Sequence, residues 1–335
     1  MSKKLKALVL NSKFLSLSID DLKSNTTVPI EWHVIDSSKK EDIRKLLPDF
    51  NVLVSTSMDI SWKNESKNLE AIFMPGAGWD KISPEAVPEG CVVTNSYEHE
   101  VGIAEYVLMS MIALDRELIN SHNSSTKNNW DYWPARFGPF KELTGRNVTV
   151  IGLGRIGKKV LELTKVFGMN NYAVEEFDVT EEIVSDLKIT EVVKPKDMTK
   201  LISISDFVVV CVPYIESTKG LIGEKEIYSM KNDAFIINPA RGPIIKDEHL
   251  YNALKSNRIA GACLDTWYTY PKGASDNPKP SEYPFNELKN VILTPHICGS
   301  TYGTASRRMK IVAENINNFY NDKPLINVVE ELSKI

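Results

Sequence analysis

Short apolar runs alternate with amphipathic stretches along most of this chain, and each kind predicts a different element. Runs rich in Val, Ile and Leu are typical of buried strands in a parallel sheet. They occur at residues 5–10, 31–35, 52–56, 69–74, 91–94, 148–151, 172–174, 207–212, 234–238, 260–264 and 291–294. Amphipathic stretches predict helices, for example at residues 40–47 and 305–320. Alternating strands and helices predict an α/β fold with parallel sheets.

The length of 335 residues suggests two domains, at roughly 150 residues each. The first hundred or so residues predict a small α/β domain of their own. The helix at residues 305–320 should return to that domain, since a helix after the last strand has no place left in the second sheet.

Three stretches depart from the alternation of strands and helices. Residues 102–119 are apolar all round, which predicts one long buried helix and a possible subunit interface. Residues 121–141 are polar and aromatic and predict a surface arm. Residues 272–284 are rich in proline and serine and predict an excursion loop.

The stretch from residue 147 to residue 176 organises the chain. A β-branched run at 148–151 precedes G-L-G-R-I-G at 152–157, then apolar residues follow at helical spacing, and the next strand ends before Glu175. This order predicts a dinucleotide-binding βαβ unit. The alternatives are a glycine turn in another α/β protein and a methyltransferase loop.

Each marked position in this unit has a physical reason. Gly152 permits the tight turn, Gly154 leaves no Cβ between backbone and pyrophosphate, and Gly157 lets the helix pack against the strand. Unpaired N–H groups and the dipole of the helix start favour phosphate. Glu175, 18 positions after Gly157 (175 − 157), would bind the ribose hydroxyls and repel a 2′-phosphate. The sequence therefore predicts NAD and disfavours NADP.

Composition excludes several other functions. A net charge of −4 does not indicate a nucleic acid or an acidic membrane as the main partner. The four cysteines and five histidines are widely scattered, so the sequence predicts no metal site and no disulfide framework. No apolar run approaches the ~20 residues of a membrane span, and the N-terminal residues lack a signal-peptide pattern. We therefore expect a cytoplasmic protein.

Three candidate functional residues follow runs that predict strands. Arg241 comes after the run at 234–238, Asp265 directly after 260–264, and His296 after 291–294. In open α/β sheets, ligands bind at the carboxyl ends of the strands. We therefore expect Arg241, Asp265 and His296 to face the cofactor crevice.

Several motifs resemble those of the D-isomer-specific 2-hydroxyacid dehydrogenase family, which includes phosphoglycerate, glycerate and formate dehydrogenases. The matching stretches are PGAGWD (75–80), VGIAEYVL (101–108), GLGRIG (152–157), VFGM (166–169), VPYIESTKGLIG (212–223), INPARGPI (237–244), GACLDTW (261–267) and LTPHICGST (293–301). The resemblance implies two Rossmann-like domains, each a parallel sheet with flanking helices. The NAD-binding domain, residues 102–297, would be inserted into a substrate domain made of residues 1–101 and 298–335.

The resemblance also implies catalytic residues. The arginine of the family's N-x-A-R-G motif matches Arg241, and the histidine of T-P-H matches His296. The usual glutamate before proline falls on Tyr270 in the run LDTWYTYP. A phenol is neutral at pH 7, whereas a carboxylate would favour the imidazolium. We therefore predict that His296 is less basic than in relatives that carry the glutamate.

These residues suit hydride transfer between nicotinamide and a small (R)-2-hydroxy acid or its 2-oxo partner. Arg241 would bind the carboxylate, and His296 would exchange the hydroxyl proton, because a histidine pKa of about 6.5 suits neutral pH. The predicted substrate contacts are Gly76, Ala77, Gly78 and His99. The predicted cofactor contacts are Gly152, Gly154, Arg155, Ile156, Gly157, Glu175, Val212, Pro213, Thr218, Pro239, Ala240, Asp265 and Gly299.

Alternatives stay open at several points. Tyr270 also suits a formate dehydrogenase, because formate oxidation removes no proton from the substrate, although His99 stands where those enzymes carry asparagine. Asp276 or Glu282 would be another source of negative charge near the histidine. Asp265 could cap its strand instead of contacting nicotinamide. A protein that senses NAD(H) without turnover is a further alternative. The apolar helix and aromatic arm suggest a homodimer, as does the resemblance.

Overall fold

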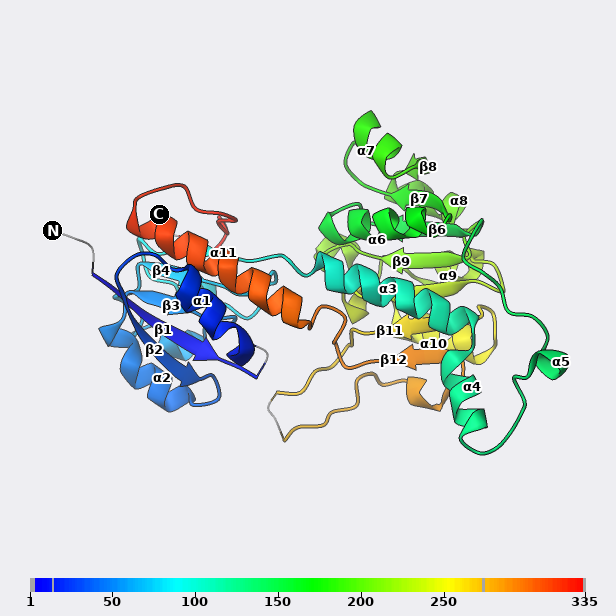
Figure 1. Ribbon diagram of the computed structural model, residues 1–335, viewed down its shortest axis with the longest axis horizontal. Coiled ribbons are helices and arrows are strands. Elements are labelled where there is room, and N and C mark those ends of the chain that lie inside the picture. Colours follow the sequence, from blue (N-terminus) through cyan, green and yellow to red (C-terminus); the bar gives the residue numbers. More distant parts are fainter. Residues whose placement is uncertain (1–3, 14, 273–274, 334–335) are drawn as a thin grey trace. The chain divides into compact units, whose positions relative to one another are not determined.

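The computed structural model describes residues 4–13, 15–272 and 275–333, and the chain divides into two compact units. Unit 1 comprises Met1–His99 and Ser300–Ile335, and unit 2 comprises Glu100–Gly299. Each unit contains a parallel sheet with helices on both faces (Figure 1). The predicted fold class of two Rossmann-like α/β domains is therefore confirmed.

Unit 1 is built around a sheet with the strand order β2-β1-β3-β4-β5. Its strands are β1 (Leu5–Asn11), β2 (Ile30–Asp36), β3 (Val52–Val54), β4 (Ala71–Phe73) and β5 (Val92–Thr94). The helices α1 (Ile19–Asn25) and α11 (Tyr302–Tyr320) bury apolar residues on one face, and α2 (Lys40–Leu46) does so on the other. The helix near the end of the chain thus packs on the sheet formed by the first hundred residues.

Unit 2 is built around a sheet with the strand order β12-β11-β10-β9-β6-β7-β8. Its strands are β6 (Asn147–Ile151), β7 (Asn170–Val174), β8 (Ile189–Val193), β9 (Phe207–Val210), β10 (Phe235–Asn238), β11 (Gly261–Leu264) and β12 (Val291–Leu293). The chain runs outward from β6 to β8 and then returns to place β9 on the other side of β6. This reversal is a topological switch point, where open α/β sheets bind ligands.

Helices cover both faces of the unit 2 sheet. On one face lie α3 (Glu100–Asp115) and α6 (Arg155–Val166). On the other face lie α8 (Met198–Ile202), α9 (Glu224–Ser229) and α10 (Asp247–Lys255). The remaining helices are α4 (Leu118–Ser125), α5 (Pro134–Phe137) and α7 (Glu181–Asp186). Both faces of the strands are thereby buried, which explains their nearly continuous apolar sequences.

The prediction of a single buried helix over residues 102–119 is wrong. The helix α3 ends at Asp115, and Glu117 adopts a left-handed conformation with φ 49° before α4 begins at Leu118. One side of α3 is also exposed, because Met109 and Ile112 are 49% and 38% accessible in the single chain. The apolar residues of α3 therefore lie partly in the core and partly on an exposed side of the helix, so an apolar sequence did not mean complete burial here.

The strand β8 was missing from the sequence prediction. Its sequence, ITEVV, is short and contains Glu191, and it forms the edge of the sheet, so its outer side is only partly buried. Other predicted strands lose residues at their ends, as at residues 55–56 and 211–212. The excursion loop at residues 272–284 contains residues 273–274, which lie outside the described part of the chain.

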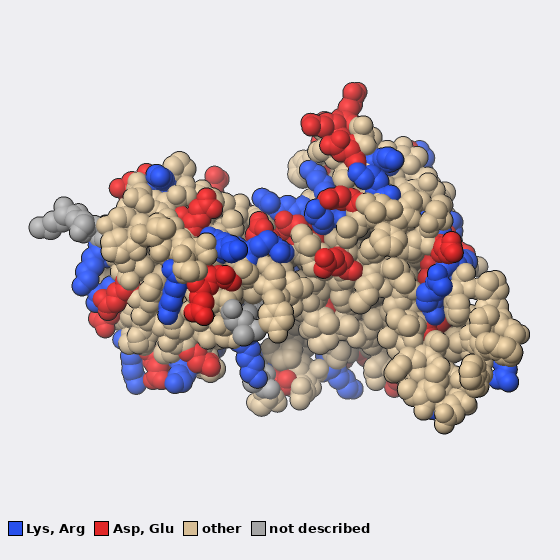
Figure 2. Space-filling model, in the orientation of Figure 1, with Lys and Arg blue, Asp and Glu red and all other residues tan. Residues whose placement is uncertain are grey.

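The surface is mixed in charge. On the face shown in Figure 2, acidic and basic side chains are interspersed over both units, and the arm around α5 is largely uncharged. Within the described residues, no helix combines the length and apolar character that crossing a membrane requires.

Candidate active site

The glycine turn between β6 and α6 requires glycine at Gly152 and Gly157. Gly152 has φ +97°, and an added Cβ would lie 2.8 Å from Cγ1 of Val212. An added Cβ at Gly157 would lie 2.0 Å from the carbonyl oxygen of Gly152, because α6 starts directly against the turn. Any side chain at either position would therefore displace the backbone.

Gly154 faces open space. Among the described residues, no heavy atom comes within 4 Å of a Cβ added at Gly154, which is the N-cap of α6. Arg155 and Ile156 are the first residues of that helix. An approachable backbone at the start of a 12-residue helix suits the pyrophosphate of a dinucleotide. The turn therefore fits the cofactor that the sequence predicts.

Glu175 directly follows β7 and lies beside the turn. Its Oε2 accepts a hydrogen bond of 2.6 Å from the backbone N–H of Leu153, and Oε1 accepts one of 3.1 Å from Phe177. The side chain is half-buried and also lines a hollow of about 360 Å³ together with Phe177 and Lys194. The carboxylate thus fixes the turn while part of it faces the adjoining hollow.

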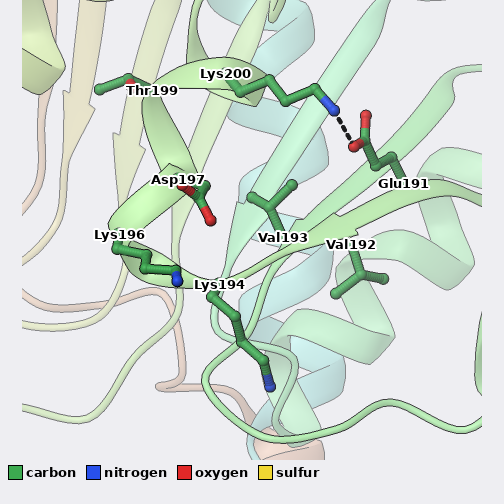
Figure 3. A pocket seen from close by; sticks show the side chains of 8 residues that line it. All are labelled: Glu191, Val192, Val193, Lys194, Lys196, Asp197, Thr199 and Lys200. Atoms are coloured by element: carbon green, nitrogen blue, oxygen red, sulfur yellow. Dashed lines mark hydrogen bonds and ion pairs between the residues drawn. The ribbon is translucent and has the colours of Figure 1, made fainter.

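A second cavity, of about 510 Å³, lies along the edge strand β8 (Figure 3). It is lined by Glu191, Val192, Val193, Lys194, Lys196, Asp197, Thr199 and Lys200. Lys200 forms an ion pair with Glu191 across it. Because β8 is at the opposite edge of the sheet from β12, this cavity is remote from His296.

The loop after β9 carries the predicted cofactor contacts Val212, Pro213 and Thr218. The hydroxyl of Thr218 donates a 2.6 Å hydrogen bond to the carbonyl oxygen of Pro213 and accepts one of 2.9 Å from Ile215 N–H. These bonds close the loop on itself. Val212 also packs against Gly152, so the loop borders the glycine turn.

Arg241 stands on a loop that the side chain of Asn238 holds in place. Asn238 is 1% exposed at the end of β10; its Nδ2 donates to the carbonyl oxygen of Arg241, and its Oδ1 accepts from Ala240 N–H, at 2.9 and 3.1 Å. Pro239 directly follows Asn238. The guanidinium donates to the carbonyl oxygen of Ala240 over 2.8 Å and is half-buried. These hydrogen bonds hold the loop in one shape.

His296 stands on a loop that the side chain of Asp265 holds. The imidazole is exposed, and the backbone of His296 is left-handed, with φ 60°. Asp265 is fully buried at the end of β11, and its carboxylate accepts hydrogen bonds from Ile297 N–H at 2.8 Å and Cys298 N–H at 2.9 Å. This arrangement supports the interpretation of Asp265 as a structural cap more than as a nicotinamide contact.

Tyr270 lies beside His296, with ring centroids 5.5 Å apart and the rings tilted by 52°. Its hydroxyl accepts a 3.0 Å hydrogen bond from Trp267 N–H. Burial raises the pKa of Tyr270, while that hydrogen bond and the positive charge of Arg241 act in the opposite direction. With the pKa raised, the phenol is neutral at pH 7, and the position beside the histidine carries no negative charge.

Asp276, the proposed alternative source of charge, is engaged within its own loop. Its Oδ2 accepts a 2.9 Å hydrogen bond from Lys272 N–H. Glu282 is exposed. The ring of Tyr270, in contrast, packs against the imidazole.

The candidate functional residues Arg241, Asp265 and His296 of unit 2 lie on one side of its sheet, where the strands end. The strands β10, β11 and β12 are parallel neighbours, so their carboxyl ends bring Arg241, Asp265 and His296 to the same edge. Gly299, another predicted cofactor contact, is the last residue of unit 2. Within residues 4–13, 15–272 and 275–333, no cluster of three or more His, Cys, Asp or Glu side chains could hold a metal ion.

The predicted substrate contacts of unit 1 follow its strands β4 and β5. The carbonyl oxygens of Gly76 and Ala77 accept hydrogen bonds from Ser96 N–H and Asn95 Nδ2, at 3.0 and 2.8 Å. Among the described residues, Oδ1 of Asn95 and Oγ of Ser96 are buried without a hydrogen-bond partner. Gly78 continues this loop, and His99 is the last residue of the first of the two segments that form unit 1.

Sequence reasoning missed the side chains that hold the loops of Arg241 and His296. The sequence predicts Asn238 and Thr294 only as the last residues of the strands at 234–238 and 291–294. Tyr106 was read as part of an apolar helix, although its hydroxyl is 2.5 Å from Oγ1 of Thr294. A polar residue at the last position of a buried strand, or within an apolar helix, is the signal that could have identified them.

Comparison with known proteins identifies the family that the chain resembles. The family model for the NAD binding domain of D-isomer specific 2-hydroxyacid dehydrogenases matches residues 108–298. The D-3-phosphoglycerate dehydrogenase of Methanocaldococcus jannaschii is 32% identical over 304 residues, which are 89% of this chain and 55% of that protein. The glyoxylate reductase of Thermofilum pendens is 30% identical over 273 residues, or 79% and 76% of the two chains.

Solved structures show the same fold. The D-mandelate dehydrogenase of Rhodotorula graminis superposes with a TM-score of 0.82 at 22% identity, covering 98% of each chain. The chain spans little more than half the length of the phosphoglycerate dehydrogenases of Methanocaldococcus jannaschii and Archaeoglobus fulgidus, whereas it spans 76% of the glyoxylate reductase of Thermofilum pendens. Taken with the glycine turn and the loops at Arg241 and His296, these matches show that the chain belongs to the D-isomer specific 2-hydroxyacid dehydrogenase family.

Proposed function

We propose that this chain is an NAD(H)-dependent oxidoreductase that transfers a hydride between nicotinamide and a small (R)-2-hydroxy acid or its 2-oxo partner. The observation that carries the proposal is the position of Arg241 and His296 after β10 and β12, the two strands that flank β11, so that both residues lie at the carboxyl ends of the strands in a nucleotide-binding sheet. The substrates that name the relatives, phosphoglycerate and glyoxylate, support a small carboxylic acid.

Arg241 would hold the substrate. Its guanidinium is planar and permanently charged, so it can donate parallel hydrogen bonds to a carboxylate and an adjacent C2 oxygen. Each such charged hydrogen bond contributes about 1.5–3 kcal/mol. The anchoring of its loop by Asn238 limits the entropy lost when the substrate binds.

His296 would move the proton. In reduction, the imidazolium donates a proton to the C2 oxygen of the 2-oxo acid; in oxidation, the neutral imidazole removes the hydroxyl proton. The nicotinamide, when bound, supplies or accepts the hydride. Tyr270, neutral beside the ring, would orient His296 without stabilising its charge as a carboxylate would.

We propose NAD as the preferred cofactor. Glu175 lies beside the glycine turn and lines the adjoining hollow, where its charge would repel a 2′-phosphate. Lys194 lines the same hollow, but its ammonium group is bonded to the carbonyl oxygen of Glu176 and to the carboxylate of Asp178. Turnover with NADH should therefore exceed turnover with NADPH at equal concentrations.

The substrate contacts proposed for unit 1 are Gly76, Ala77, Gly78 and His99, and they rest on the resemblance. Backbone N–H groups of the glycine loop would donate to the substrate carboxylate. His99→Asn should then change the KM of the 2-oxo acid while the affinity for NADH stays the same.

We also propose a homodimer formed through α3, α4 and the arm. Apolar side chains exposed on these segments in the single chain are Val101, Met109, Ile112, Leu118, Ile119, Trp130, Trp133 and Phe137. Large apolar side chains exposed on the surface in this number are typical of a protein interface. Sedimentation equilibrium of the whole chain tests this: a monomer at micromolar concentration would contradict it.

Formate oxidation is the second candidate function. It is favoured by Tyr270, because a formate C–H can lose its hydride with no proton removed from the substrate and therefore needs no carboxylate partner for the histidine. A comparison of substrates would distinguish the two functions, since a formate dehydrogenase would oxidise formate, whereas a 2-hydroxyacid dehydrogenase would reduce the C2 carbonyl of a 2-oxo acid, a group that formate lacks.

A panel of substrates tests the proposed function. Glyoxylate, hydroxypyruvate, pyruvate and longer or aromatic 2-oxo acids are offered with NADH, formate is offered with NAD, and the absorbance of NADH is followed. We expect one 2-oxo acid at least to be reduced and formate not to be oxidised. Tight NADH binding without turnover on any of these compounds would favour a sensing protein instead.

A further inference from the structure

A line of buried hydroxyl groups connects α3 to the loop that carries His296. The hydroxyl of Tyr106 is 2.5 Å from Oγ1 of Thr294, and Thr294 donates a 2.6 Å hydrogen bond to Oδ1 of Asp265. All of these residues belong to unit 2. The line ends at the carboxylate that holds the backbone N–H groups of Ile297 and Cys298, on the C-terminal side of His296.

The hydroxyl protons in this line have a single consistent arrangement. A carboxylate only accepts hydrogen bonds, so the hydroxyl of Thr294 donates its proton to Asp265. Oγ1 of Thr294 has no second proton, so it accepts the hydrogen bond that the hydroxyl of Tyr106 donates. The phenol oxygen also lies 3.2 Å from Sγ of Cys263, a thiol that donates to Oγ of Ser110. Each hydroxyl proton therefore has an acceptor, and the hydrogen bonds are donated in one direction, from Tyr106 on α3 to Thr294 and from Thr294 to Asp265.

Burial makes this line strong. Tyr106 is 9% exposed and Asp265 is fully buried, so water competes little for either group. Burial raises the pKa of the Tyr106 hydroxyl, which keeps it protonated and able to donate. Indole Nε1 of Trp267 donates a 2.9 Å hydrogen bond to the carbonyl oxygen of Thr294, which fixes the backbone of the same residue.

The loop needs such support because its backbone is unusual. His296 has φ 60°, a left-handed conformation that is uncommon for residues other than glycine, although asparagine, aspartate and histidine adopt it more often than the rest. The neighbouring backbone is held by the Asp265 carboxylate, whose orientation depends in turn on Thr294. Without the donor from Tyr106, Thr294 is free to turn its hydroxyl away from Asp265.

We propose that Tyr106 is a positioning residue for His296, acting through Thr294 and Asp265. This inference rests on the proposed function, since it assigns the positioned imidazole to proton transfer. Tyr106 contacts neither substrate nor cofactor in this account. Its hydroxyl keeps Asp265 in the orientation that holds the loop, so the imidazole is presented in one direction. Because the side chain of Asn238 makes its own hydrogen bonds to the Arg241 loop, substrate binding should depend much less on Tyr106 than turnover does.

Four variants test this inference. Tyr106→Phe and Thr294→Val remove the hydroxyl groups, Thr294→Ser retains a hydroxyl at position 294, and Tyr268→Phe is the matched control. Tyr268 is a tyrosine of the same unit whose hydroxyl donates to the carbonyl oxygen of Ile245, away from the histidine loop. The quantities measured are kcat and KM for the reduced 2-oxo acid, Kd for NADH, and amide hydrogen exchange of the peptide covering residues 294–299.

We expect Tyr106→Phe and Thr294→Val each to lower kcat about 10- to 100-fold, as misplaced catalytic groups do, with KM and Kd nearly unchanged. Combining them should cost no more than either alone, because both interrupt one line. Thr294→Ser should restore most of the turnover lost in Thr294→Val. The amides of Ile297 and Cys298 should exchange faster in the first two variants and not in Tyr268→Phe.

The exchange measurement separates failure of this inference from failure of the proposed function. If the wild type reduces no 2-oxo acid, faster exchange at residues 294–299 in Tyr106→Phe still supports the positioning role. Unchanged exchange, or a kcat equal to that of Tyr268→Phe, would overturn it. If Tyr106→Phe does not fold, the comparison of Thr294→Val with Thr294→Ser decides the question in the same way.

Discussion

The loops of Arg241 and His296 follow β10 and β12, the two strands that flank β11, yet different chemistry holds each loop. The Arg241 loop is held by the neutral amide of Asn238, which both donates and accepts. The His296 loop is held by the carboxylate of Asp265, which accepts from Thr294 and from two backbone N–H groups. A guanidinium keeps its charge throughout the working pH range and needs a fixed direction, whereas an imidazole must change its charge during turnover.

The difference suggests how the chain manages without the usual glutamate. Tyr270 is neutral beside His296, and the buried carboxylate of Asp265 holds the loop that carries the histidine. The comparison therefore predicts that changes at His296 act on turnover, and that changes at Arg241 act on binding.

The largest effect is expected for His296→Asn. Loss of the proton donor should lower kcat about 1,000-fold, within the range of general acid–base catalysis, with Kd for NADH unchanged. His33→Asn is the control, because His33 is an exposed histidine on β2 in unit 1. Steady-state kinetics on the best 2-oxo acid measure the effect. A variant that keeps more than a tenth of wild-type kcat would remove His296 from the chemistry.

A smaller effect, and on a different quantity, is expected for Arg241→Lys. Lysine keeps the charge but loses the planar pair of donors, so KM should rise about 10- to 100-fold, the equivalent of one charged hydrogen bond. The fall in kcat should be much smaller than for His296→Asn. Arg258→Lys, which changes a surface arginine bonded to Asn232, is the control. If Arg241→Lys lowered kcat alone, the division of labour between the two loops would be wrong.

The smallest effect is expected for Tyr270→Glu, as a shift in pH dependence. Reduction requires the imidazolium, so its rate is high below the pKa of His296 and falls as pH rises through that pKa. A carboxylate at position 270 favours the imidazolium and should move this falling limb of the pH–rate profile up by about one pH unit. Tyr270→Phe, which adds no charge, should leave the limb in place. A downward shift in Tyr270→Glu would contradict the assignment of His296 as the proton donor.

The βαβ unit was predictable from sequence because its requirements are local. Each glycine of the motif has one role: Gly152 allows the turn, Gly154 leaves the helix start open to a ligand, and Gly157 allows close packing. Each of these requirements can be read from the spacing along the chain. The placing of Arg241 and His296 at one edge also followed, because carboxyl ends of parallel strands meet there. The predicted fold class, with one parallel sheet in each domain, is confirmed. It too followed from a local pattern, the alternation of strands and helices.

What sequence reasoning missed depends on contacts between distant residues. Tyr106 and Thr294 are 188 positions apart, and their hydrogen bond exists only after α3 has packed near the end of β12. Asp265 was expected at the crevice, but its carboxylate turns towards a loop 32 residues later in the chain. The break at Glu117 has no glycine or proline to mark it, since its left-handed backbone falls on a glutamate.

The most direct test of the central claim is isotope transfer from labelled cofactor. NADH carrying deuterium at nicotinamide C4, on the face that is transferred, is incubated with the protein and the best 2-oxo acid of the panel, and the product is analysed by NMR and chiral chromatography. The account predicts deuterium on C2 of the hydroxy acid, in the (R) configuration, in wild type and almost none in His296→Asn. A product without deuterium, or of (S) configuration, would contradict it.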